Sequence, residues 1–241
     1  MTSKHRKLDA ESSNLIDKPA DYRKLVGKLN FLTHTRPDIA FPIQLLSQFM
    51  AFPREQHWNA AIHVLKYIAK DVVQGILLNN KPDYALTGYC DADWAACPQT
   101  RRSISGFLVF MGGSLISWKS KKQQTVSLSS AEAEYRSLRR ITAELAWLRR
   151  LLTELQVPNI QAILAKCDSQ AAIHIAKNPV REKHIDLDCH FVREKLLDGL
   201  ISLSYIPTLQ QPADLFTKAL PGPLHHQLQH KLGLFHSHPP T

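Results

Sequence analysis

The fold is decided by one stretch, residues 104–119, which reads ISGFLVFMGGSLISWK. Two apolar runs rich in β-branched and aromatic residues flank the pair Gly112-Gly113, and this pattern is typical of a β-hairpin. The run from Tyr84 to Cys90 is also apolar and ends at acidic residues, which indicates one more strand before the hairpin. The stretch and its flank therefore predict three consecutive strands.

After the hairpin, helical and strand patterns alternate along the chain. In order, we expect a long helix from Ser129 to about Leu155, a strand over Ile160–Cys167, a short helix through Ile175, a helix over Asp186–Leu197, a strand over Ile201–Ile206 and a helix from Ala213 onward. This order predicts a mixed α/β layer sandwich rather than a doubly wound parallel sheet.

The part of the chain before the strands has a helical texture. Residues 1–20 are polar, and we expect a flexible leader there. Residues 21–70 show helical periodicity, and residues 71–83 suit a connector. The apolar stripes expected to be buried are Leu25, Leu29 and Leu32, then Ile43, Leu46 and Phe49-Met50, then Ile62, Leu65 and Ile68.

Composition limits the class of protein. The 241 residues are 44% hydrophobic, enough for one large domain or one domain with an appendage, and 21% charged residues argue against general disorder. No apolar run approaches the roughly 18–20 residues that cross a bilayer, and the first residues lack the apolar stretch of a signal peptide. The four scattered cysteines indicate reduced thiols. We therefore expect a soluble, intracellular protein with no membrane partner.

The formal charge of +9 favours a polyanionic partner, because each cation that meets a phosphate releases condensed counterions. Residues 98–131 contain no Asp or Glu. The basic residues in that span that we expect to contact a nucleic-acid backbone are Arg101, Arg102, Lys119, Lys121 and Lys122. The alternative is an ordinary solvated face.

Two acidic residues follow the first strand. Asp91 and Asp93 share one strand face, so alternation cannot separate them, and an Asp at a strand end often caps a turn.

Glu134 is a sharper candidate, because it extends the core-facing stripe of the long helix through Leu138 and Ile141. A lone carboxylate on such a face costs several kcal/mol unless it is paired or binds a metal. At roughly 100° per residue, Glu132 points about 120° away from Leu138. The helix dipole explains that first-turn acid, and we expect Glu132→Gln to be nearly silent.

Two further acids are weak candidates when taken singly. Asp168 follows a buried strand and could serve only as an N-cap, and Asp214 could be a first-turn helix acid. Together the four carboxylates have a distribution that allows them to converge on one sheet edge. Clustered carboxylates suit Mg²⁺ or Mn²⁺ rather than zinc.

Several motifs resemble, in order, those of the ribonuclease H domain of copia-type retrotransposon Pol polyproteins of plants. They are Leu86-Thr87-Gly88-Tyr89-Cys90-Asp91-Ala92-Asp93-Trp94, Ser117-Trp118-Lys119, Ser130-Ala131-Glu132-Ala133-Glu134-Tyr135, Cys167-Asp168-Ser169-Gln170, Lys183-His184-Ile185-Asp186 and Ala213-Asp214-Leu215-Phe216-Thr217-Lys218. Upstream, Tyr22 to Leu29 and Thr35-Arg36-Pro37-Asp38-Ile39 resemble the segment that links polymerase to ribonuclease H in the same polyproteins.

The resemblance implies an α/β fold with a five-stranded mixed sheet, its first three strands antiparallel, flanked by helices and preceded by a helical appendage. It implies a leader at 1–20, a helical segment at 21–83, a ribonuclease H domain at 84–222 and a C-terminal helix and tail at 223–241. It assigns catalysis and metal binding to Asp91, Glu134, Asp168 and Asp214, and it alone prefers Asp91 to Asp93.

The implied activity is endonucleolytic hydrolysis of the RNA strand of RNA/DNA hybrids with two Mg²⁺ ions, Mn²⁺ being the alternative. The implied partners are the hybrid and the polymerase portion of the same polyprotein. The implied location is the cytoplasm, inside a virus-like particle in an intact element, with the nucleus as the alternative. No Tyr-x-Asp-Asp motif is present, so we expect no polymerase activity.

The sequence also departs from the family pattern. Residues 180–182 make an unusually short loop, and Thr208-Leu209-Gln210-Gln211 stand where some related enzymes have a histidine. One alternative is a catalytically impaired nucleic-acid-binding remnant of a polyprotein. A zinc site of Cys167, His184, Cys189 and His190 is another reading, but its spacing fits no common zinc module.

Overall fold

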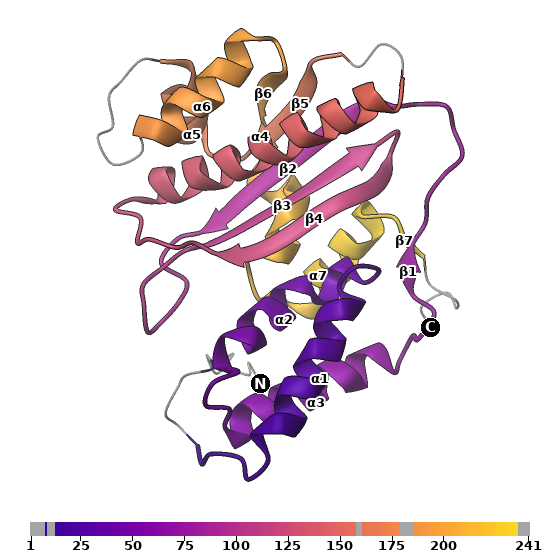
Figure 1. Cartoon of the computed structure of the whole chain (residues 1–241), viewed down its shortest axis with the longest axis vertical. Coiled ribbons are helices and arrows are strands. Elements are labelled where there is room, and N and C mark those ends of the chain that lie inside the picture. The colour runs from indigo at the N-terminus through magenta and orange to yellow at the C-terminus, as the bar shows by residue number, and fades with distance from the viewer. Residues whose placement is uncertain (1–7, 9–12, 158–160, 179–185, 236–241) are drawn as a thin grey trace.

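The computed structural model of this chain describes residue 8 and residues 13–157, 161–178 and 186–235. Figure 1 shows a layered α/β body standing on a bundle of three N-terminal helices. The short loop expected at 180–182 lies outside the described residues. None of the helices within these ranges is long and apolar enough to cross a membrane.

A five-stranded sheet forms the centre of the upper body. Its strands are β2 (Leu86–Asp93), β3 (Ile104–Met111), β4 (Ser114–Lys122), β5 (Ile163–Cys167) and β6 (Ile201–Tyr205), in the order β4-β3-β2-β5-β6. β2, β3 and β4 pair antiparallel, whereas β5 and β6 are parallel to β2 and to each other. The predicted mixed sheet, with its first three strands antiparallel, is confirmed.

The turn between β3 and β4 depends on glycine. Gly112 and Gly113 have φ angles of 54° and 81°, a region that side chains other than glycine rarely adopt. A Cβ on Gly112 would also lie 2.1 Å from the Asp83 carbonyl oxygen. The two-residue glycine signal in the sequence therefore corresponds to a real steric requirement.

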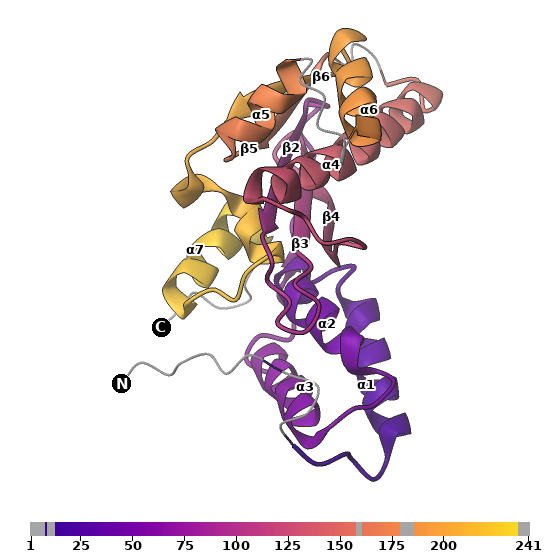
Figure 2. The same cartoon turned by 90° about the vertical axis from the view of Figure 1, so that its left-hand side faces the viewer.

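Each face of the sheet is covered by helices. Helix α4 (Ser130–Glu154) packs on one face together with α5 (Gln170–Lys177) and α6 (Asp186–Leu197), as Figure 2 shows. The other face carries the 3₁₀ helix η4 (Pro212–Phe216), α7 (Gly222–Lys231) and part of α2 (Ala40–Leu46). Phe107 packs toward α4 and the next residue, Leu108, toward η4, which is the alternation of a sheet buried on both sides.

The N-terminal bundle consists of α1 (Pro19–Leu32), η1 (Pro37–Ile39), α2, η2 (Ser47–Phe49) and α3 (Glu55–Ile68). Its core contains Tyr22, Val26 and Val64, whereas Leu65, expected inside, is 38% exposed. Within the span of the expected leader, Leu15 bridges to Arg54 and α1 begins at Pro19, so the described residues from 15 onward are not a flexible tail. Backbone hydrogen bonds hold this segment, such as the one from Ile16 N–H to Pro53 O.

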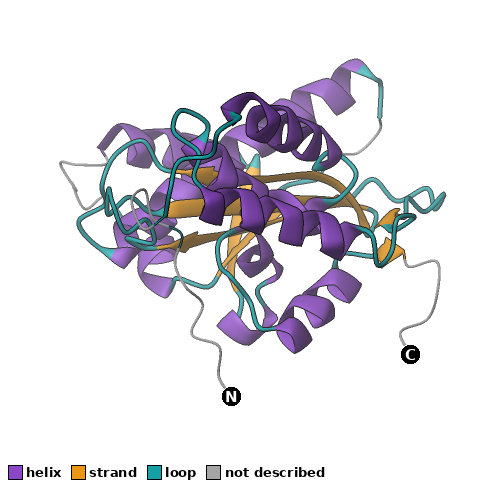
Figure 3. Ribbon diagram, turned by 90° about the horizontal axis from the view of Figure 1, so that it is seen from below, coloured by secondary structure: helices purple, strands orange, loops and turns teal. Residues whose placement is uncertain are grey.

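Several contacts join the bundle to the rest of the molecule. β1 (Gly75–Ile76) pairs with β7 (Leu234–Phe235) inside the expected connector. The Trp118 indole donates to the Thr33 carbonyl at 2.9 Å. A buried polar cluster, described next, also joins the two parts. Figure 3 shows from below how the helices surround the strands.

That cluster, the Arg36 cluster, consists of Arg36, Asp38, Tyr67, Gln74 and Gln229. Arg36 forms a two-pronged ion pair with Asp38, at 2.8 and 2.9 Å, and donates to Gln74 at 2.8 Å. Gln229 of α7 donates to the Tyr67 hydroxyl at 2.6 Å. Arg36 and Asp38 are each 2% exposed. The Thr35-to-Ile39 motif therefore ties the bundle to the C-terminal helix.

Candidate active site

Asp91 lies near the carboxyl end of β2 and is only 1% exposed. The Thr217 hydroxyl donates a hydrogen bond to it, and the Lys218 ammonium lies 3.3 Å from its carboxylate. Both partners come from the segment that follows η4. The first acid is therefore held by residues more than 120 positions further along the chain.

Asp214 belongs to η4 itself. Its carboxylate accepts a 2.8 Å hydrogen bond from Lys218, which thus bridges Asp91 and Asp214. Burial raises the pKa of Asp214, although Lys218 opposes the rise. The pKa of Lys218 is raised as well, because attraction to the two carboxylates outweighs the effect of burial.

Glu134 and Asp168 form the second half of the cluster. Glu134 projects from the second turn of α4, and Asp168 follows the last residue of β5. Ligand atoms of Glu134, Asp168 and the buried Cys167 all lie within 4.8 Å of one another. The Thr208 hydroxyl donates to one Asp168 oxygen at 2.9 Å, whereas the other oxygen is buried without a partner among the described residues.

The four carboxylates also influence one another electrostatically. Burial, opposed by Lys218, raises the pKa of Asp91 to about 6, and the charges of Asp214 and Asp168 contribute to the rise. Burial raises the pKa of Glu134 to about 10, with Asp91 as the next cause. The structure therefore brings the four predicted acids into one mutually repelling group at one end of the sheet.

Residues that the sequence did not single out hold this geometry. The Ser137 hydroxyl of α4 contacts the backbone carbonyls of Asp91 at 2.8 Å and Gly106 at 3.2 Å. The Gln211 amide, 1% exposed, donates to the Cys90 carbonyl at 2.9 Å and accepts from the Ala213 N–H. Thr217 and Lys218 lie in a motif already recognised. Gln211 was noted only as part of a departure from the family pattern, and nothing in the sequence marked Ser137.

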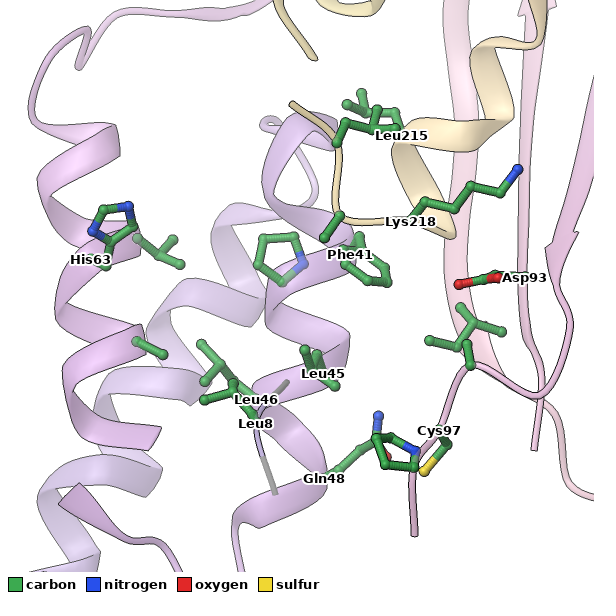
Figure 4. A pocket seen from close by; sticks show the side chains of 18 of the residues that line it. Leu8, Phe41, Leu45, Leu46, Gln48, His63, Asp93, Cys97, Leu215 and Lys218 are labelled. Carbon is green, nitrogen blue, oxygen red and sulfur yellow. The ribbon is translucent and has the colours of Figure 1, made fainter. Parts of the chain in front are cut away.

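Asp93 is the last residue of β2, two residues beyond Asp91. It lines a cavity of about 660 Å³ between α2, α3 and the loop after β2. Figure 4 shows Asp93 at the wall of this cavity near Lys218, whose ammonium points away from it. Although the two acids share a strand face, Asp91 is the one bridged by Lys218 to Asp214.

Glu132 lies in the first turn of α4, as the sequence indicated, but it is more tightly bound there than its helical angle suggested. Its side chain is 5% exposed and accepts hydrogen bonds from the Leu128 N–H at 2.8 Å and from Arg136 at 2.6 Å. The helix begins on the Ser129 cap, so Glu132 folds back over the first turn instead of facing solvent. Glu132→Gln should therefore lower stability.

The N-cap alternative for Asp168 is wrong. The residue that caps α5 is Ser169, whose hydroxyl accepts from the Ala172 N–H at 3.2 Å. Asp168 therefore does not cap α5, and N-capping does not explain an acid at this position.

The predicted phosphate-binding residues occupy different surroundings. Arg101, Lys119 and Lys121 are exposed, and Arg102 is partly buried. Lys122 instead donates to the Gln48 side chain at 2.6 Å and approaches the Cys97 sulfur at 3.3 Å. Lys122 is therefore engaged inside the protein, between η2 and the loop after β2.

The donor set fits a hard divalent cation. The four acids offer carboxylate oxygens, the ligands that Mg²⁺ and Mn²⁺ prefer. A buried Asp168 oxygen has no partner in the described ranges, and cations would relieve the repulsion that raises the neighbouring pKa values. The zinc reading gains no support, because Cys189 packs in the apolar core, His190 is exposed and His184 lies outside the described residues.

Comparison with known proteins identifies relatives over almost the whole chain. It is 39% identical over 231 residues to the retrovirus-related Pol polyprotein from transposon RE2 of Arabidopsis thaliana, covering 95% of this chain and 16% of that protein. It is 37% identical over 215 residues to the corresponding polyprotein from transposon TNT 1-94 of Nicotiana tabacum, covering 88% and 16%. The chain thus spans about one sixth of these relatives. No family model matches it.

Among solved structures, the chain is similar to LC11-RNase H1 in complex with RNA/DNA hybrid. The identity is 14% and the TM-score 0.43, covering 55% of this chain and 93% of that one. RNase H1 from Halobacterium salinarum gives 16% identity and a TM-score of 0.42, covering 55% and 94%.

Proposed function

Because the chain belongs to the family of retrovirus-related Pol polyproteins of plant transposons, we propose that it is the ribonuclease H part of such a polyprotein. Its reaction would be hydrolysis of the RNA strand of an RNA/DNA hybrid. The observation that carries the proposal is the meeting of Asp91, Glu134, Asp168 and Asp214 at one sheet end.

In this proposal, Asp91 and Asp214 form one side of the site and Glu134 and Asp168 the other. These carboxylates would hold two Mg²⁺ ions, with Mn²⁺ as the alternative. When bound, such ions supply an activated water and stabilise the negative charge that develops on the phosphate oxygens.

The remaining residues of the site act on the carboxylates. Thr217 orients Asp91, Thr208 orients Asp168, and Gln211 fixes the segment that carries Asp214 to β2. Lys218 neutralises part of the negative charge when the acids face each other without cations. Such fixed carboxylates suit catalysis, because ligands held in place need little reorganisation during the reaction.

The substrate would be recognised by shape and backbone rather than by base sequence, as is usual for proteins that read 2′-hydroxyls across a groove. The net charge of +9 supports binding to such a polyanion. In the intact polyprotein, the partner would be the polymerase portion of the same chain.

The test is a cleavage assay with the purified chain and a hybrid labelled on its RNA strand. We expect RNA fragments in the presence of Mg²⁺ and none in EDTA, while double-stranded DNA of the same sequence stays intact. If the hybrid is bound equally with and without Mg²⁺ but never cleaved, the chain is a binding remnant and the proposed activity is wrong.

A further inference from the structure

Lys218 places a positive charge of the protein's own between two carboxylates of the site. Its ammonium donates to one Asp214 oxygen at 2.8 Å and lies 3.3 Å from each oxygen of Asp91. These are the same oxygens that would bind divalent cations in the proposed function. The question is therefore how Lys218 and such cations share them.

The two acids are fixed around the ammonium. Asp91 is 1% exposed, and one of its oxygens accepts a hydrogen bond from the Thr217 hydroxyl. Asp214 belongs to η4, whose residues from Pro212 to Phe216 are all buried. Neither carboxylate can turn toward solvent without breaking this packing. Any rearrangement between the three charged groups must therefore come from the Lys218 side chain.

The side chain of Lys218 has room to move. Its backbone is held, because the Lys218 N–H donates to the Asp214 carbonyl at 3.1 Å. The side chain, in contrast, is 31% exposed and has a flexible four-carbon stem. Lys218 also lines the cavity of about 660 Å³ beside Asp93, as Figure 4 shows. A change of rotamer alone can therefore take the ammonium away from both acids.

The ammonium and a divalent cation exclude each other electrostatically. Mg²⁺ approaches its oxygen ligands to about 2.0–2.1 Å, so it would share the immediate surroundings of the ammonium. Like charges at such distances repel strongly in a partly buried site, because protein screens them less than water does. By linkage, the Lys218 bridge must weaken cation binding by the same factor by which a bound cation weakens the bridge.

We propose that Lys218 competes with divalent cations for Asp91 and Asp214, bridging the two acids when no cation is bound and turning away from them when one binds. Lys218 is thus a positioning residue that lowers and sets the affinity of the site for these ions. The inference rests on the proposed function in one respect, namely that the acids bind divalent cations.

The opposite role is a permanent bridge that keeps the two carboxylates in place for the ions. The two roles differ in sign. Removing a competitor strengthens cation binding, whereas removing a bridge that the ions need weakens it.

The experiment measures Mn²⁺ binding to the purified chain without nucleic acid, by electron paramagnetic resonance of the free ion. Lys218→Met removes the charge and keeps most of the stem, and Lys218→Arg keeps the charge. The matched control is Lys166→Met on β5, which removes a lysine whose ammonium donates to the Tyr89 hydroxyl at 3.5 Å. Circular dichroism confirms that each variant is folded.

We expect Lys218→Met to bind Mn²⁺ at least about tenfold more tightly than the wild type, a factor that one like charge about 4 Å away can exceed. Lys218→Arg should stay within about threefold of the wild type, because the guanidinium keeps the positive charge. Lys166→Met should stay within about twofold, because a more distant charge is screened by salt.

A second measurement uses the wild type and does not depend on the folding of any variant. In crystals soaked with Mn²⁺, the Lys218 ammonium should lie beyond hydrogen-bond distance of both Asp91 and Asp214. A soaked crystal in which Mn²⁺ occupies the acids while Lys218 still contacts both would overturn the inference.

Equal or weaker Mn²⁺ binding by Lys218→Met would also overturn it, and so would binding by Lys218→Arg as tight as that of Lys218→Met. Failure of both the wild type and Lys218→Met to bind Mn²⁺ would refute the inference and the proposed function together. Tighter binding by Lys218→Met in a chain that cleaves no hybrid would support the inference and count against the proposed function alone.

Discussion

At the scale of single residues, the site is a compromise between folding and chemistry. Burying Asp91 and Glu134 beside other acids disfavours their ionised forms, and the result is pKa values of about 6 and about 10. Lys218 offsets this repulsion only on the Asp91 and Asp214 side. Without cations, Glu134 should therefore be the acid that most strongly opposes folding at high pH.

A stability measurement can test this. An unfolded Glu has a pKa of about 4.3. When folding raises the pKa of a carboxyl, that group stabilises the folded state most strongly at pH values below its unfolded-state pKa. The contribution is lost as the pH rises through the folded value. In EDTA, the wild type should lose stability as the pH rises toward the Glu134 pKa of about 10, and Glu134→Gln should lose less.

The melting temperature of Glu134→Gln should exceed that of the wild type at pH 8, by a margin that widens with pH. For a chain of this size, each kcal/mol corresponds to about 2–4 °C. Glu132→Gln, two residues earlier in the same helix, is the control. It removes a charged partner of Arg136, so it should melt lower than the wild type. A constant margin between pH 6 and pH 9 for Glu134→Gln would contradict the account.

The sequence predicted all four acids but not what surrounds them. Glu134 stood out because it continued an apolar helix stripe. Glu132 was misread because helical angle alone ignores a side chain that folds back to the N-terminal backbone. Ser137 and Gln211 could not be identified, because their partners are backbone carbonyls on strands 31 to 121 residues away.

At the scale of elements, the site depends on how closely η4 approaches β3. A Cβ on Gly106 would lie 2.7 Å from both the Phe216 Cβ and the Thr217 methyl group. Such contacts are shorter than packed atoms tolerate, so the segment that carries Asp214 and Thr217 can lie against the strand only if residue 106 is glycine.

Gly106→Ala should therefore destabilise the protein by about 1–3 kcal/mol. Because η4 must move away from Asp91, it should also reduce hybrid cleavage at temperatures where the variant is folded. Urea unfolding and the cleavage assay measure the two effects. The control is Gly27→Ala in α1, which meets no atom within 4 Å and should raise stability by up to about 1 kcal/mol. Equal behaviour of the two variants would refute the close-packing argument.

Strong local patterns predicted the elements well. β3 spans Ile104–Met111 as expected, since a short continuous apolar run that ends at a glycine turn leaves few alternatives. The prediction failed where tertiary contacts decide. The segment from Ala213 is a 3₁₀ helix whose residues Pro212 to Phe216 are all buried, and β1 exists because β7 pairs with it.

At the scale of the whole molecule, we expect the helical bundle and the sheet to unfold together as one cooperative unit. The Arg36 cluster joins residues 38 and 229 through Asp38, Tyr67 and Gln229. A boundary at residue 84, as the sequence suggested, would cut through this buried network and remove β1. The four-part division of the chain remains a prediction.

Arg36→Met tests the connection. It leaves Asp38 buried without its guanidinium partner, which should cost about 3–5 kcal/mol. We expect one cooperative urea transition in the wild type and a lower midpoint, still in a single transition, in the variant. The exposed Arg23→Met is the control and should shift stability by no more than about 0.5 kcal/mol. Two separate transitions in the wild type would show that bundle and sheet fold independently.

The central claim, that the four gathered carboxylates cleave the RNA of a hybrid, is tested most directly by their amide variants in the Mg²⁺-dependent assay. Asp91→Asn, Glu134→Gln, Asp168→Asn and Asp214→Asn should each lower the rate at least about a hundredfold, because an amide cannot supply an anionic ligand. Asp93→Asn, two residues along the same strand face, should retain most activity. Full cleavage by all four amide variants would contradict the proposed site, and loss with Asp93→Asn but not Asp91→Asn would move the first ligand to residue 93.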